Sequence, residues 1–130
     1  MAVENSRLID GNTLLLEVSE GKSYAITTII VCNTYTPDPS DPLLGQAEFD
    51  LHLITKAEVD AELVWEDAIS NRNKVINGIS LNAGETYSFD SEKLILTEGD
   101  IIVFAATPDE NPGTPTGYTN LSATVSYLEV

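Results

Sequence analysis

The sequence predicts an all-β protein, an antiparallel two-layer β-sandwich of eight or nine short strands, with the jelly roll as one form of this architecture. Two observations support this prediction. Apolar and polar residues alternate with a period of two in several segments, and all six prolines fall in two windows, at residues 35–46 and 108–118. Proline is excluded from central strands, so the windows are predicted loops and the segments between them can form strands. A closed barrel is the second architecture that this pattern allows.

The predicted strands are, in chain order, 13–18, 23–34, 47–55, 74–77, 79–82, 85–90, 93–97, 101–107 and 119–129. The segment 23–34 is β-branched and apolar for most of its length, which predicts a central strand. The segments 47–53 and 121–127 alternate strictly between apolar and polar residues. They therefore predict strands with one buried face and one face in contact with solvent, as in antiparallel sheets.

Three glycines share one spacing pattern. Gly21, Gly84 and Gly99 each have an apolar residue three positions before them and two more at three and five positions after them. A strand, a tight turn that needs a positive φ at glycine, and a second alternating strand would produce this pattern. Reuse of one turn type explains it, and an internal duplication is the alternative.

The segment 56–74 fits a strand and a helix about equally well. Alternation favours a strand, whereas a helix would place Glu58, Glu62 and Glu66 in a like-charged i,i+4 row, which destabilises a helix. We therefore expect an extended excursion that ends in a short helical turn near residues 66–72.

The chain has 130 residues, 21 acidic residues and six lysines or arginines, for a formal net charge of −15. This length predicts a single domain over residues 1–130, with long loops at 35–46, 56–73 and 108–118. The negative charge repels phosphate backbones and anionic lipids, so we expect neither nucleic acid nor a membrane as partner. The first residues resemble no signal peptide and no apolar run approaches a membrane span, which predicts a soluble protein made inside a cell.

The sequence predicts no catalytic residue, no cofactor and no metal site, and hence a protein that is not an enzyme. His52 alternates outward beside Asp50 and is expected to be a surface or interface residue, since no nucleophile is predicted near it. Cys32 has no second cysteine to pair with and is expected to be a buried, inert thiol. The loops 38–41 and 109–111 offer oxygen ligands for calcium, but their spacing is not that of a calcium-binding loop.

The loops and the last strand supply the candidate contacts with a partner. Long loops without regular structure are often functional, and apolar side chains on them have little core of their own. The candidate partner-contact residues are Leu43, Leu44, Trp65, Tyr118, Leu121 and Tyr127. The stretch 111–128 lacks charged residues although it is half polar, so it is the first place to expect a partner, and the C-terminal strand is a candidate docking element.

Six segments resemble, in order and spacing, a pattern of small virion structural proteins of tailed bacteriophages, particularly marine phages that infect cyanobacteria. The segments are LLLEV at 14–18, YAITTIIVCNT at 24–34, FDLHL at 49–53, VINGISLNAGETY at 75–87, KLILTEGD at 93–100 and LSATVSYLE at 121–129. The resemblance covers roughly three quarters of the chain. The long loops at 35–46 and 108–118 and the excursion at 56–72 depart from the pattern.

This resemblance implies a non-enzymatic β-sandwich used as a capsid decoration, neck or tail component. Such a protein is made in the host cytoplasm, resides in the virion, contacts other virion proteins and forms a homo-oligomer. The alternative function is carbohydrate binding by a fibre or adhesin domain, in which Trp65, Tyr87, Tyr118 or Tyr127 would stack on sugar rings.

Overall fold

The computed structural model of the chain describes residues 2–107 and 118–130, and their side chains except those of residues 91–93 and 118. The strands are, in chain order, β1 (Ala2–Ile9), β2 (Gly11–Glu17), β3 (Ser23–Asn33), β4 (Ala47–Ile54), β5 (Lys74–Leu81), β6 (Thr86–Thr97), β7 (Ile101–Thr107) and β8 (Tyr118–Glu129). Helix α1 (Lys56–Asp60) and the 3-10 helix η1 (Trp65–Ala68) lie between β4 and β5. The loop predicted at 108–118 lies outside the described residues, apart from the backbone of its last residue.

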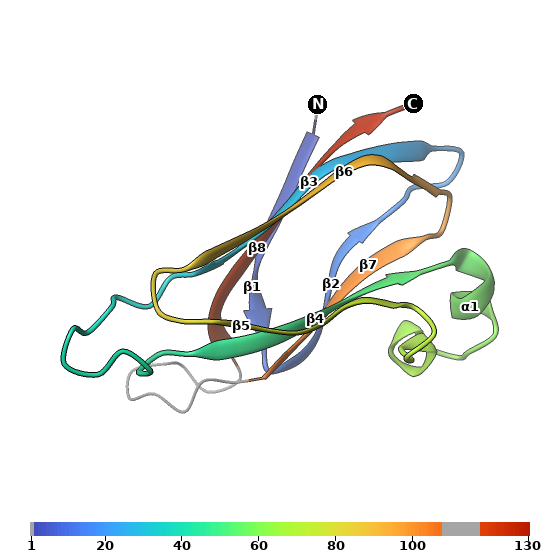
Figure 1. Ribbon diagram of the computed structural model, residues 1–130. Coiled ribbons are helices and arrows are strands. Elements are labelled where there is room, and N and C mark those ends of the chain that lie inside the picture. The colour runs from blue at the N-terminus through green and yellow to red at the C-terminus, as the bar shows by residue number, and fades with distance from the viewer. Residues whose placement is uncertain (1, 108–117) are drawn as a thin grey trace.

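The strands form two antiparallel sheets that face each other (Figure 1). Sheet A has the order β1-β8-β3-β6, and sheet B has the order β2-β7-β4-β5. The pairs β1 with β8, β2 with β7, β3 with β6 and β4 with β5 are nested, as if one long hairpin had been rolled up into two layers. This nesting is the jelly-roll topology. The structure therefore confirms the predicted antiparallel two-layer sandwich, in its jelly-roll form.

The three glycines that share a spacing pattern all lie in turns between strands. Their φ angles are +76° at Gly21, +80° at Gly84 and +82° at Gly99, so each has the left-handed conformation that the pattern predicts. The turns connect β2 to β3, β5 to β6 and β6 to β7. The rule that glycine is needed where φ is positive thus locates three strand boundaries correctly.

Three strands differ from the predictions. β5 and β6 were each predicted as two strands, but each is continuous and contains an irregularity in its pairing with the neighbouring strand. In β5 the irregularity includes Gly78, whose φ is +65°. β1 was not predicted at all. Leu8 is its one fully buried side chain, so its sequence carries almost no apolar alternation to detect.

Strand β3 is central, as predicted, because it pairs with both β8 and β6. Its outward side chains are not fully covered, however. Ile30 is exposed and Cys32 is only half-buried. The expectation of a fully buried Cys32 thiol is therefore wrong, since this side chain lies on the outer face of sheet A.

Strand β8 pairs with β1 along one edge and with β3 along the other. Both edges are thus occupied within the chain. The C-terminal strand, predicted as a candidate docking element, therefore has no free edge to offer a partner strand. The missed strand β1 is the reason, because it occupies the edge that β8 would otherwise present.

The excursion between β4 and β5 covers the outer face of sheet B. It begins with α1, whose Thr55 and Glu58 form a capping box, and continues into η1. The expected helical turn near 66–72 overlaps η1, whereas the helix at 56–60 was predicted as extended chain. The excursion and the sheet form a second apolar cluster, made of Leu14, Ile54, Val59, Trp65, Ala68, Ile69, Ile101 and Val103.

His52 lies beneath this excursion and is only 2% exposed. It points outward from the sheet, as alternation predicts, but it is not a surface residue. Its Nδ1 lies 2.7 Å from Oδ1 of Asn73, and the Asn73 Nδ2 group donates to Ala68 O at 2.8 Å and to Glu58 Oε2 at 3.0 Å. Asn73 thus joins the sheet, η1 and α1 through one buried side chain.

Replacing Asn73 with alanine is expected to destabilise the excursion. The change removes the partners of His52, Glu58 and the Ala68 carbonyl, and an unsatisfied buried polar group costs about 1–3 kcal/mol. Trp65, the single tryptophan of the chain, lies in the excursion and reports on it by fluorescence. We expect its emission to shift to longer wavelength at lower urea concentration in the variant than in the wild type. Asn71→Ala, an exposed residue nearby, is the control and should unfold like the wild type.

The stability of the excursion should also depend on pH through Glu58. The hydrogen bond from Asn73 lowers the pKa of the Glu58 carboxyl below its ordinary value of 4.5. The ionised carboxylate therefore stabilises the folded state above that pH, and this contribution is lost as the pH falls through the lowered pKa. We expect Trp65 fluorescence in moderate urea to show an acid transition that Glu58→Gln weakens. An identical transition in Glu58→Gln would contradict this assignment.

Candidate functional site

The structure separates the six predicted contact residues. Leu43 is 65% exposed at the tip of the loop between β3 and β4, and Leu44 beside it is partly buried. The side chain of Tyr118 lies outside the described ones. Leu121 belongs to the core between the sheets and is fully buried, so it is not a surface contact residue. Its position follows from β8 being a central strand.

The two remaining candidates are also largely covered. Trp65 is partly buried and packs against the outer face of sheet B. Tyr127 is buried and stacks against Tyr24, with 4.4 Å between the ring centroids, and burial raises the pKa of the Tyr127 hydroxyl. The Tyr127 ring is therefore covered in the folded chain. Of the described aromatic residues proposed for carbohydrate binding, Trp65 and Tyr87 retain partial exposure.

The loop between β3 and β4, predicted at 35–46, is anchored by Asn33. The buried Asn33 Nδ2 group donates to Gly45 O at 2.7 Å and to Leu81 O at 3.0 Å, and its Oδ1 accepts from the Tyr35 amide at 3.0 Å. One side chain therefore holds both ends of the loop to the end of β5. This anchoring fixes the loop beside the β5–β6 turn.

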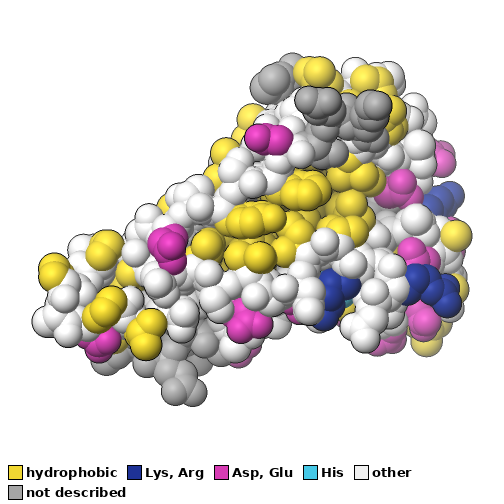
Figure 2. Space-filling view, in the orientation of Figure 1, with side chains coloured by type: hydrophobic (Ala, Val, Ile, Leu, Met, Phe, Trp, Pro, Cys, Tyr) yellow, Lys and Arg dark blue, Asp and Glu magenta, His cyan; other side chains and the backbone are white. Residues whose placement is uncertain are grey.

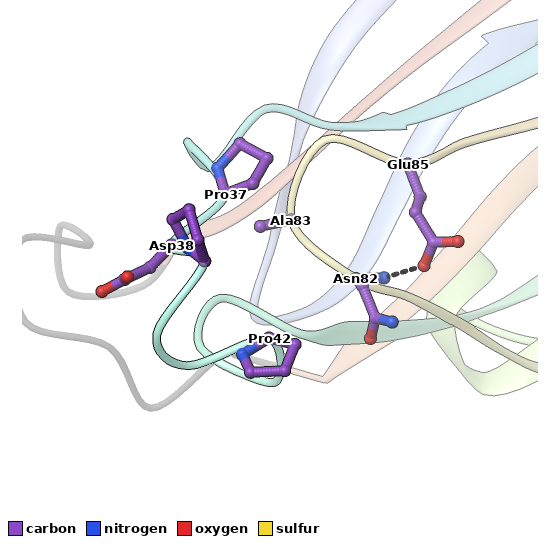
Figure 3. A pocket seen from close by; sticks show the side chains of 7 residues that line it. Pro37, Asp38, Pro42, Asn82, Ala83 and Glu85 are labelled. Carbon is purple, nitrogen blue, oxygen red and sulfur yellow. Dashed lines mark hydrogen bonds between the residues drawn. The ribbon is translucent and has the colours of Figure 1, made fainter.

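A pocket of about 310 Å³ lies between this loop and the β5–β6 turn (Figure 3). Its lining is mainly apolar and consists of Pro37, Asp38, Pro39, Pro42, Asn82, Ala83 and Glu85. Both carboxylates of the pocket accept hydrogen bonds from residues close to them in the chain. Ser40 donates to Asp38 from its hydroxyl and its amide, which lowers the pKa of the Asp38 carboxyl, and Glu85 Oε1 accepts from the Asn82 amide at 2.6 Å. The pocket offers an apolar contact at the end of the sandwich.

A second apolar surface lies along one edge of the sandwich. The two sheets contact each other at the β1–β2 edge, whereas β5 and β6 run apart at the opposite edge (Figure 1). We call this opposite side the open edge. Five inner-face side chains remain partly exposed there, namely Leu53, Ile79, Tyr87, Phe89 and Leu94. Figure 2 shows the hydrophobic area in a hollow between the two sheets.

The open edge is continuous with the core. Tyr87 packs edge-on against the buried Phe49, with centroids 6.0 Å apart, and Phe49 in turn contacts Phe104 at 5.8 Å. Ile79 pairs with Phe49 across β5 and β4, and Phe89 pairs with Ile29 across β6 and β3. The core residues therefore lie directly behind this surface and support it.

The surroundings of the open edge are mainly acidic. Asp90 is exposed on β6, Glu85 is exposed in the β5–β6 turn, and a carboxylate oxygen of Glu48 lies over the bulge at Gly78. Among the described side chains of β5 and β6, Lys74 is the one basic group, and it pairs with Asp50 at 3.4 Å. An apolar centre is thus bordered by carboxylates.

Sequence reasoning did not identify this surface. Tyr87, Phe89 and Leu94 alternate on β6 like ordinary core residues, and nothing in the pattern shows that the facing sheet leaves them partly uncovered. The one feature of the sequence that allows an edge strand here is the predicted turn directly before β6, because a strand beside a turn can lie at the edge of a sheet. Edge position depends on the pairing of all eight strands, which the local pattern does not contain.

Within the described ranges, no helix has both the length and the apolar character of a membrane span, and no three metal-ligating side chains gather into a possible ion site. Comparisons with protein-family models, with curated proteins and with solved structures find no match to this chain.

Proposed function

We propose that this chain is a non-enzymatic structural protein of a tailed-phage virion, a capsid decoration, neck or tail component, that binds other virion proteins through its open edge. The observation that carries the proposal is the partly exposed apolar band formed by Ile79, Tyr87, Phe89 and Leu94. Contiguous apolar surface on a soluble chain is characteristic of contact sites with other proteins or ligands. In the proposed role the protein is made in the host cytoplasm and then joins the particle.

The architecture supports this role. Jelly rolls occur in viral capsid domains and also in lectins, so the fold alone does not select a function. It agrees with the resemblance of the sequence to phage structural proteins. The function is therefore argued from the surface, with the fold as a compatible scaffold.

The charge of the chain supports it as well. A net charge of −15 keeps copies of the protein apart before assembly, while the uncharged centre of the open edge stays free for docking. The homo-oligomer implied by the resemblance stays a prediction. Light scattering of the purified protein tests it directly.

Purified particles provide the test of the virion role. The tagged chain is expressed in host cells during infection by the phage that encodes it, and particles are isolated on a density gradient and analysed by mass spectrometry. We expect the chain at a constant ratio to the major capsid protein. Absence of the chain from the particles would contradict the virion role.

A matched pair of variants tests the role of the open edge. Leu94 faces the open edge, while Ile95 is 59% exposed on the opposite face of the same strand. We expect Leu94→Lys to reduce incorporation into particles and Ile95→Lys to leave it unchanged, with both variants checked for cooperative unfolding. Equal incorporation of the two variants would assign docking to another surface.

A further inference from the structure

We infer that the open edge binds an extended segment of a different protein, which adds to β6 as a fifth strand of sheet A and carries apolar residues at alternate positions with lysine or arginine between them. This inference rests on the proposed function and specifies its partner. It follows from the backbone of β6, the shape of β5, the exposed side chains and the charge around them.

Strand β6 has a free edge with a regular stretch. Within residues 2–107 and 118–130 it pairs with β3 alone, and residues Thr86–Asp90 are in uninterrupted register with β3. Asn33 N donates to Glu85 O at 2.9 Å, which shows that the carbonyl group of Glu85 points toward β3. Because bonding alternates along an antiparallel strand, the backbone groups of Thr86, Ser88 and Asp90 point away from β3. They are available to pair with an added strand.

Strand β5, the other border of the open edge, is unsuited to pairing. Its register with β4 shifts twice. At one shift Gly78 has φ +65°, and its amide donates to Asp50 Oδ1 at 2.6 Å. Bulges of this kind twist an edge away from further pairing. An incoming strand is therefore directed to β6.

An added strand beside Thr86–Asp90 would cover the exposed part of the core. Side chains alternate between the two faces of a sheet, so every second residue of the incoming segment would lie on the inner face with Tyr87 and Phe89. These positions suit apolar side chains. The residues between them would lie on the outer face, beside Ser88 and Asp90.

Charge identifies the partner as a different and basic chain. Glu85 and Asp90 are exposed beside the free edge of β6, and Lys74, the one basic group among the described side chains of β5 and β6, is already paired with Asp50. A second copy of this chain would bring the same carboxylates and the same net charge of −15. Lysine or arginine on the incoming segment complements these carboxylates.

Synthetic peptides test this inference on the purified full-length protein. The probe alternates valine and lysine over about eight residues, and the comparison peptides alternate valine with glutamate and serine with lysine. In about 0.15 M salt, we expect the valine–lysine peptide to bind at least about tenfold more tightly than either comparison peptide. Hydrogen exchange should show new protection at Thr86, Ser88 and Asp90. Equal binding of the serine–lysine peptide, or protection elsewhere, would overturn the inference.

Two variants of Ser88 sharpen the test. Ser88→Pro removes an amide that points away from β3, and proline is tolerated at such edge positions, so we expect an intact fold and loss of peptide binding. Ser88→Ala keeps the amide and should bind like the wild type. If Ser88→Pro fails to fold, a valine–lysine peptide N-methylated at every residue replaces it, and this peptide should not bind the wild type because none of its amides can donate to β6. Binding by Ser88→Pro, or by the methylated peptide, would refute strand addition.

The peptide-binding experiment and the particle experiment test separate claims, so either can fail without the other. Specific peptide binding by a chain that is absent from particles would support strand addition and remove the virion role. A chain that is present in particles but binds no valine–lysine peptide would keep the virion role and remove strand addition.

Discussion

Replacing Phe104 with alanine is expected to lower the free energy of unfolding by about 3–5 kcal/mol, the largest effect of any substitution considered for this protein. Phe104 is 0% exposed and lies between the two sheets, in contact with Phe49. Its removal leaves a cavity that neighbouring strands, held by pairing on both sides of β7, cannot close. Urea unfolding of the wild type and the variant measures the difference.

Phe89→Ala is the matched control for this prediction, because it makes the same chemical change at the open edge. Phe89 is partly exposed, so solvent can fill the space that its ring leaves, and less apolar burial is lost. We expect Phe89→Ala to cost less than half as much as Phe104→Ala. Equal costs would show that Phe89 is buried in solution, and the open edge would then lose its basis.

Replacing Asn33 with alanine is expected to cost about 2–3 kcal/mol. The change leaves the carbonyls of Gly45 and Leu81 without the Asn33 amide group, and the Tyr35 amide without the Asn33 oxygen. It also releases the loop between β3 and β4 from the end of β5. Unfolding by urea measures the cost, and hydrogen exchange should show faster exchange at Tyr35 and along the loop.

Asn77→Ala serves as the control for Asn33→Ala. Asn77 is exposed, and its Oδ1 accepts a 3.3 Å hydrogen bond from Lys74 Nζ. Its loss should change stability by no more than about 0.5 kcal/mol. A cost at Asn33 as small as the cost at Asn77 would show that the loop is not held by Asn33.

Several features could be predicted because a local rule determines them. Gly21, Gly84 and Gly99 occupy positions where φ is positive, and a side chain disfavours that conformation whatever the rest of the fold does. Alternation along 47–53 predicted the inner and outer faces of β4 correctly for the same reason, since side chains of a strand point to opposite faces in turn.

Other features could not be predicted because they depend on distant segments. His52 was correctly placed on the outer face of its strand, but whether that face meets solvent depends on the excursion, which Asn73 holds over it. The error for Cys32 is the opposite one. The apolar residues around it in the sequence predicted a buried side chain, but it lies on the outer face of sheet A, which is only partly covered. Alternation identifies a face, and only packing determines what covers it.

The candidate site shows the same distinction. Leu43 was correctly placed on an exposed loop, whereas Leu121 and Tyr127 were assigned to a contact surface and lie in the core. Their strand was predicted as a candidate docking element, and its pairing with β1 and β3 makes it central. The open edge was missed because exposure there arises from the divergence of two sheets.

The order of residues was enough to predict an acidic β-sandwich with glycine turns, a proline-containing loop between β3 and β4, and the inner and outer faces of its alternating strands. These properties depend on backbone conformation and on side chains a few residues apart, which the order of residues records directly. The tertiary structure alone decided which strands lie at the edges, that His52 is covered, and that apolar core is accessible between β5 and β6. Each of these is set by contacts between residues far apart in the chain, and the separation of two sheets leaves no periodic trace in the sequence.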